Sequence, residues 1–147
     1  MATLVSQDAQ VTIEKAMSFS MEPVLKRYAR VYELPMDVVR DHERELKRYL
    51  AMCAMREKGN GTYGLRGPVD ELWHTFIIFT QLYTEFCSSV AGRYLHHAPT
   101  EVSKSDGTEK YSTTLSVYKT IFGEEAPVSV WPQLNDDQFA SGSSDCC

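Results

Sequence analysis

The sequence lacks the features that would direct a small chain to a membrane or to nucleic acid. A membrane-spanning helix needs about 20 apolar residues in a row. No run approaches that length, and the longest candidate, residues 72–83, carries His74 and Gln81. Positive charge is also scarce, since 20 Asp and Glu against 15 Lys and Arg give a formal net charge of -5. This balance does not attract nucleic acid or anionic lipid, so we expect neither as a partner.

Cysteine is too rare to build a disulfide framework, and no secretion signal is visible. The four cysteines match neither a disulfide nor a zinc-knuckle spacing; they are Cys53, Cys87, Cys146 and Cys147. Cys53 and Cys87 fall within apolar helical patterns, which favours buried, reduced thiols. The N-terminus has no positively charged region followed by an apolar one. The sequence therefore predicts a cytoplasmic protein.

The chain is instead rich in helical periodicity. Its 147 residues suit one domain, and 43% of them are apolar, enough for a single core. Apolar residues recur at helical spacing and give no convincing strand, which predicts an all-α, single-domain bundle of about five helices. The expected helices cover about 7–18, 21–33, 36–58 and 68 to 87 or 91, with a last one ending at Gly123.

The expected domain has polar segments at both ends. We expect residues 1–20 to form an N-terminal segment with a short helix, and residues 21–132 to form the helical domain. Within it, residues 127–132 are expected to be extended and to lay Val128, Val130 and Trp131 on the core. Residues 133–147 turn polar and acidic, which predicts a disordered tail.

The helix expected at 36–58 has an apolar stripe and a charged side. The stripe includes His42, for which a buried, hydrogen-bonded role is favoured over metal binding. The basic residues of the charged side are Arg40, Arg44, Lys47 and Arg48. They alternate with acidic residues, as on a solvated helix surface. The alternative is a basic strip that binds an acidic protein partner.

Three of the four histidines lie within 24 residues: His74, His96 and His97. Asp70 precedes His74 by four residues, so both project from one helix face. Such a pair can bind a metal ion together, or the carboxylate can simply orient the imidazole. Zinc or iron needs at least three protein ligands, so His96 or His97 would have to join them. Neighbouring side chains usually point apart, and we favour His97 slightly.

The path of the chain decides whether these residues can meet. In a helix unbroken to Ala91, His74 lies about 25 Å from the helix end. The five residues that follow recover only about 14 Å. A helix ending near Cys87 leaves enough chain to return to His74. The geometry therefore permits a shared site without requiring one.

The same region resembles a known family. Residues 67–87 read GPVDELWHTFIIFTQLYTEFC and residues 92–99 read GRYLHHAP. This order of motifs, with a later Trp-Pro ending, is similar to the glycine-rich domain-containing protein-like family over about residues 40–132. The matching positions include Trp73, Tyr83 and Cys87, which we expect to be structural or to support the histidines. The RNA association of the plant relatives is not carried over, because this chain has neither an RNA-recognition domain nor a long glycine-rich tract.

Two hypotheses for function follow. The first is a metal-binding helical domain, with Asp70, His74 and His96 or His97 around zinc or iron. An open coordination position would permit hydrolase or oxygenase chemistry, and a closed one would make the metal structural. The second is a non-enzymatic adaptor or inhibitor that binds a protein partner and in which the histidines are buried polar supports. Nothing resembles a Ser-His-Asp arrangement, so the reaction is left unassigned.

Overall fold

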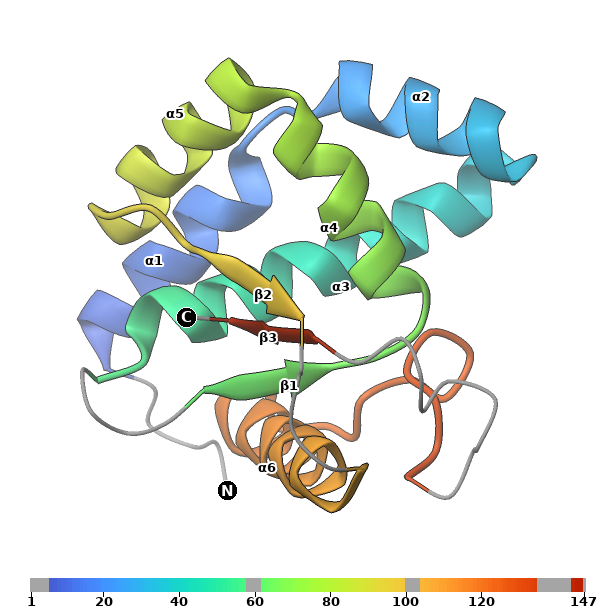
Figure 1. The fold of residues 1–147 in the computed structure, drawn as a ribbon. Helices are drawn as coiled ribbons and strands as arrows, with labels where there is room; N and C mark the ends of the chain where they lie inside the picture. The colour runs from blue at the N-terminus through green and yellow to red at the C-terminus, as the bar shows by residue number, and fades with distance from the viewer. Residues whose placement is uncertain (1–5, 58–61, 100–103, 135–143, 147) are drawn as a thin grey trace.

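The computed structural model describes residues 6–57, 62–99, 104–134 and 144–146. The predicted all-α class is confirmed, because these residues fold mainly as six helices (Figure 1). The helices are α1 (Gln7–Ser18), α2 (Glu22–Tyr32), α3 (Met36–Met55), α4 (Pro68–Ile78), α5 (Thr80–Ala91) and α6 (Lys104–Phe122). Among the described residues, no helix is both long and apolar enough to cross a membrane. The domain boundaries at 20 and 132 stay predictions.

Local sequence signals explain several helix ends. The Ser6 side chain accepts a hydrogen bond from the Ala9 amide at 3.2 Å and caps α1. Pro68 opens α4, where its missing N–H costs little. Gly123 follows α6 with a φ of +72°, a conformation that glycine adopts without strain. These ends agree with the prediction, and α6 begins at Lys104, a start that the sequence analysis did not define.

The helix expected to run onward from Pro68 is divided at Phe79. This residue has φ -84° and ψ 69°, and its amide donates to the Phe76 carbonyl at 3.0 Å. The chain then turns back as α5, so that the Phe76 ring lies 5.0 Å from Tyr83 and 5.3 Å from Phe86 between centroids. Of the two ends expected for this helix, Cys87 and Ala91, the structure has Ala91, but the chain reaches it through the reversal at Phe79 and not as one unbroken helix.

A small sheet joins three segments that are distant in sequence. Its strands are β1 (Tyr63–Leu65), β2 (His97–Pro99) and β3 (Ser144–Cys146). β3 lies between the other two and is antiparallel to both, with Asp145 opposite Gly64 and Ala98. Residues 144–146 therefore belong to the sheet, not to a disordered tail, and residues 135–143 lie outside the described part. Strands of three residues are too short to be recognised from alternating apolar and polar residues in the sequence.

The segment at 127–132 is a turn, which corrects the expected extended conformation. The Val130 and Trp131 amides both donate to the Pro127 carbonyl, at 3.0 and 2.8 Å. Val130 and Trp131 are buried as predicted, but Val128 is 74% exposed. A turn presents its residues in different directions, so the three side chains cannot all face the core.

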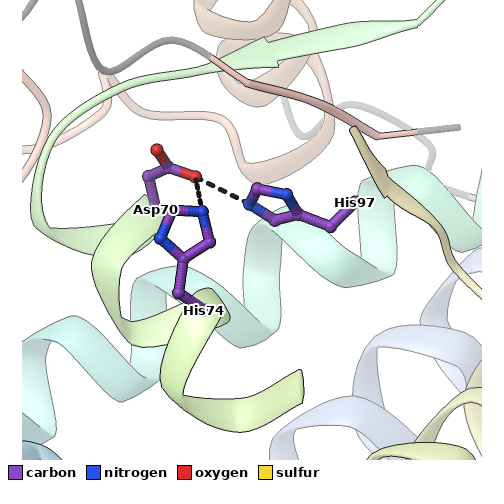
Figure 2. Close-up of side chains that lie close together, drawn as sticks. All are labelled: Asp70, His74 and His97. Atoms are coloured by element: carbon purple, nitrogen blue, oxygen red, sulfur yellow. Dashed lines mark hydrogen bonds and ion pairs between the residues drawn. The ribbon is translucent and has the colours of Figure 1, made fainter. Parts of the chain in front are cut away.

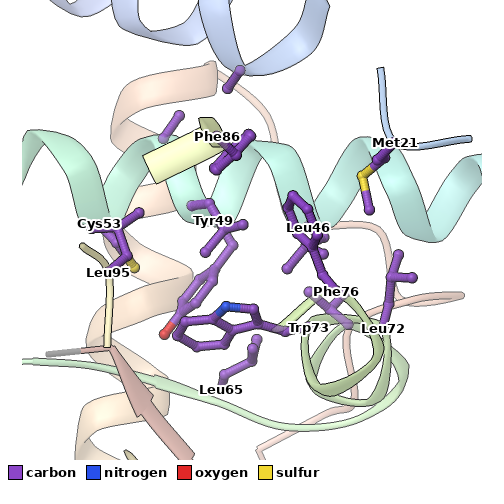
Figure 3. Close-up of a cluster of buried hydrophobic side chains, with 14 of the residues drawn as sticks. Met21, Leu46, Tyr49, Cys53, Leu65, Leu72, Trp73, Phe76, Phe86 and Leu95 are labelled. Atoms are coloured by element: carbon purple, nitrogen blue, oxygen red, sulfur yellow. The ribbon is translucent and has the colours of Figure 1, made fainter. Parts of the chain in front are cut away.

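The core is built around α3 and α4. Figure 3 shows Trp73 and Tyr49 in contact among buried aliphatic and aromatic side chains, and their ring centroids are 5.6 Å apart. Cys53 and Cys87 are buried thiols, as the apolar pattern predicts. In Figure 1, α6 packs beside β1, on the side away from α4 and α5. The strand at the other edge of the sheet, β2, lies next to α4.

Candidate metal centre

Asp70, His74 and His97 converge where α4 meets β2 (Figure 2). Oδ1 of Asp70 lies 2.9 Å from Nε2 of His97 and 3.6 Å from Nε2 of His74. One ligand atom from each residue falls within 4.8 Å of the other two. The side chains of Asp70 and His97 are 4% and 9% exposed, whereas that of His74 is 48% exposed. The group therefore has a buried side and a solvent-facing side.

The backbone at the start of α4 determines where Asp70 lies. Gly67 precedes the helix with a φ of +84°, and a Cβ there would lie 2.7 Å from Cγ of Pro132. Only glycine suits both the conformation and the contact. The Asp70 and Glu71 amides donate to the Gly67 carbonyl at 3.1 and 3.4 Å and close the first turn. His74 follows one turn later on the same helix face.

The distances within the group suit a shared ion. Metal bonds of about 2.0 to 2.1 Å place two ligand atoms about 2.9 Å apart at a right angle and about 3.4 Å apart at the tetrahedral angle. The two Asp70–histidine distances, 2.9 and 3.6 Å, lie close to this range. A hydrogen bond accounts for the first distance but not for the second, which exceeds hydrogen-bond length. The three residues form a group that could hold a metal ion.

Three motif residues hold His97 in place. The Trp73 and His97 rings pack with centroids 4.2 Å apart. Trp73 donates its indole N–H to the Tyr83 hydroxyl at 3.0 Å, and Tyr83 donates to the Leu95 carbonyl. The Leu95 amide in turn donates to Sγ of Cys87 at 3.4 Å. Trp73, Tyr83 and Cys87 thus contact His97 or the chain that leads into β2.

His96 lies apart from the group. Its side chain is exposed, and its ring lies 4.8 Å from the Tyr94 ring between centroids. His97 sits on β2 instead, next to Asp70. The structure therefore brings together Asp70, His74 and His97 of the four proposed ligands and leaves His96 out.

A family model described as UCP032817-like matches residues 9–125. The chain belongs to the UCP032817-like family. This corrects the resemblance to the glycine-rich domain-containing protein-like family, which rested on short motifs, whereas the family model covers most of the chain. No curated protein and no solved structure matches the sequence.

The basic strip of this UCP032817-like chain is already paired internally. Each of its four cations contacts a carboxylate: Arg40 with Glu22 and Glu43, Arg44 with Asp41 and Glu45, Lys47 with Glu43, and Arg48 with Glu124 and Glu45. Lys47 is only 5% exposed and also donates to the Met17 and Phe19 carbonyls at 3.3 and 2.6 Å. An acidic partner would compete with all these contacts.

Two residues beside the candidate metal-binding group were not identified from the sequence. Oε2 of Glu71 lies 3.8 Å from Nδ1 of His74, and the Tyr32 hydroxyl donates to the same oxygen at 2.8 Å. The three-residue spacing between Glu71 and His74 is a signal that places both on one side of a helix. The contact with Tyr32 joins α2 to α4 and has no signal in the local sequence.

Proposed function

We propose that this UCP032817-like chain is a metal-binding domain in which Asp70, His74 and His97 hold one zinc or iron(II) ion. The observation that supports it is the approach of two histidine Nε2 atoms to a single carboxylate oxygen, at 2.9 and 3.6 Å. The Asp70 carboxylate is nearly buried and negatively charged, so it favours a cation. Both histidine nitrogens lie close enough to the same oxygen to bind that cation with it.

The proposed site would keep room for a further ligand. Three protein ligands with an additional open position are typical of catalytic zinc sites, and two histidines with one carboxylate are typical of non-haem iron oxygenases. The 48% exposure of the His74 side chain supports an ion with one side open to solvent. An ion so placed could activate water or bind a substrate oxygen. The ligand set suits both metals, and we assign no reaction.

Elemental analysis of untagged protein tests this proposal. Unmodified protein should carry about one zinc or iron ion per chain, because three potential ligand atoms lie within 4.8 Å of one another. The double variant Asp70→Ala, His74→Ala removes two of them and should carry none. Glu85→Ala is the matched control, since this exposed α5 residue lies outside the group.

The result also separates the proposal from the second hypothesis, a non-enzymatic interaction module. If the cluster is only a hydrogen-bonded support, the unmodified chain carries no stoichiometric metal and the double variant is less stable in the presence of a chelator. A metal content that is the same in the variant and the unmodified protein would place the ion elsewhere. Either result would contradict the proposed site.

A further inference from the structure

A chain of polar contacts runs from α2 to His74. The Tyr32 hydroxyl on α2 donates to Oε2 of Glu71 at 2.8 Å. The same oxygen lies 3.8 Å from Nδ1 of His74, while Nε2 of His74 lies 3.6 Å from Oδ1 of Asp70. The two nitrogens of this imidazole therefore face two different carboxylates.

This arrangement matters because an imidazole can bind a metal only through an unprotonated nitrogen. A neutral ring carries one proton, so binding through Nε2 leaves that proton on Nδ1. A carboxylate next to Nδ1 favours this tautomer, orients the ring and makes Nε2 a stronger ligand. Glu71 is placed to have this effect on His74.

We propose that Glu71, itself held by Tyr32, positions His74 for metal binding. The inference rests on the metal site proposed above and adds two residues to it. Neither residue belongs to the group of ligand atoms around Asp70. Glu71 and Tyr32 are thus positioning residues that act through His74.

The exposure of His74 explains why it needs such a partner. Asp70 and His97 are nearly buried and are held by packing, whereas the side chains of His74 and Glu71 are both 48% exposed. An exposed side chain samples several rotamers and loses that freedom on binding. The 3.8 Å separation is longer than a hydrogen bond, so one of the two side chains must rotate before Nδ1 can donate to Glu71. Tyr32 restricts Glu71 from a second helix.

The Tyr32 hydroxyl is suited to this task. Its hydrogen bond to Glu71 raises the pKa of Tyr32 above the ordinary value of 10.0, and burial raises it further. The hydroxyl therefore remains a donor at neutral pH. A protonated donor directed at a carboxylate stabilises its orientation, so replacing Tyr32 should weaken the effect of Glu71 without removing it.

The test measures zinc affinity by competition with a chromogenic chelator. Glu71→Ala should weaken zinc binding by about tenfold or more, the range for losing an outer partner of a metal ligand. Glu71→Gln, which keeps an acceptor oxygen but loses the charge, should have an intermediate effect, and Tyr32→Phe a smaller one. The Co²⁺ absorption spectrum, which reports ligand geometry, should change in Glu71→Ala. Glu85→Gln, an exposed glutamate on α5, should match the unmodified protein in both assays.

The outcomes are distinguishable. If unmodified protein binds one zinc and Glu71→Ala binds it equally well with the same cobalt spectrum, the inference is overturned and the metal site stands. If unmodified protein binds neither zinc nor iron(II), the proposed function fails and takes the inference with it. The midpoint of thermal unfolding, measured on metal-free protein, completes the test. If Glu71 is purely structural, Glu71→Ala lowers this midpoint and leaves zinc affinity unchanged, which would also overturn the inference.

Discussion

At the residue scale, the buried carboxylate of Glu45 depends strongly on its neighbours. Its side chain has no exposed surface. It accepts hydrogen bonds from the Tyr118 hydroxyl at 2.6 Å, the Trp131 indole at 2.9 Å and Nε of Arg44 at 3.0 Å. These contacts tie α3 to α6 and to the turn at 127–132. A buried carboxylate with three donors is satisfied only as a unit.

We predict that Glu45→Ala lowers the free energy of unfolding by about 3 kcal/mol, because it leaves buried donors without an acceptor. Urea denaturation measures this change from the shift in the midpoint. Glu85→Ala, an exposed control, should change the free energy by less than about 0.5 kcal/mol. Equal losses in the two variants would contradict the role assigned to the buried carboxylate.

His42 is a buried histidine whose environment favours the neutral form. It is 6% exposed, and its Nδ1 lies 2.9 Å from the Tyr28 hydroxyl. Burial lowers the pKa of His42 below the ordinary value of 6.5, and the nearby Asp41 only partly offsets this effect. The unfolded chain therefore takes up a proton at a higher pH than the folded chain. Stability from this residue is present above pH 6.5 and is lost as the pH falls below it.

We predict that His42→Gln makes the unfolding free energy less dependent on pH between 7.5 and 5. Glutamine keeps a polar group near Tyr28 but does not titrate. Chemical denaturation at several pH values gives the two slopes directly. A slope that is unchanged by the substitution would show that His42 does not take up a proton on unfolding in this pH range.

Part of the site could be predicted at this scale. Asp70 and His74 follow from a four-residue spacing on one helix face. His97 could be proposed only as one of two adjacent histidines. Which of the two faces Asp70 depends on how β2 pairs in the sheet, and that pairing is not local. Tyr32 and Glu45 could not be found, since their partners come from distant elements.

At the scale of elements, β1 and α6 pack tightly against each other at Gly64. A Cβ added at Gly64 would lie 2.8 Å from the Tyr111 amide nitrogen and 2.9 Å from Cβ of Lys110. The Gly64 carbonyl also accepts a hydrogen bond from the Thr114 hydroxyl at 2.7 Å. A larger residue must therefore push the helix away from the strand.

We predict that Gly64→Ala destabilises the protein by about 1 to 3 kcal/mol, the usual cost of overpacking. Thermal or urea unfolding measures the loss. Thr113→Ala, on the exposed side of α6, is the control and should have little effect. An alanine variant as stable as the unmodified protein would mean that α6 adjusts without cost.

The C-terminal strand links the fold to the candidate site. β2 carries His97, and β3 is its neighbour in the sheet. We predict that deletion of residues 144–147 weakens zinc binding by about tenfold, comparable with losing an outer partner of a ligand, while the helical circular dichroism is kept. Deletion of residue 147 alone leaves β3 intact and should have no effect. Equal affinities for the two deletions would show that His97 is held without β3.

Sequence signals at this scale were reliable where they were local. Pro68 and Gly123 marked helix ends correctly, because each has a backbone preference of its own. The reversal at Phe79 had no such local marker. It is favoured by aromatic packing between α4 and α5, which is a tertiary contact. The strands were missed because three residues show no period and their partners are far away in the chain.

At the scale of the whole molecule, periodic apolar residues were sufficient to predict one all-α domain. They could not predict how α4 and β2 would meet, because that depends on the reversal at Phe79 and on the sheet. The meeting of these two elements is what creates a group of three ligand atoms within 4.8 Å. The central claim is therefore that the fold brings His97, and not its neighbour, to Asp70 and His74.

The most direct test compares two adjacent histidines. Untagged His97→Ala and His96→Ala proteins are titrated with zinc, and the stoichiometry and affinity are measured. The account predicts one zinc per chain in unmodified protein and in His96→Ala, and a loss of tight binding in His97→Ala, because only His97 faces Asp70 at 2.9 Å. Binding that survives in His97→Ala, or that is lost equally in both variants, would contradict it.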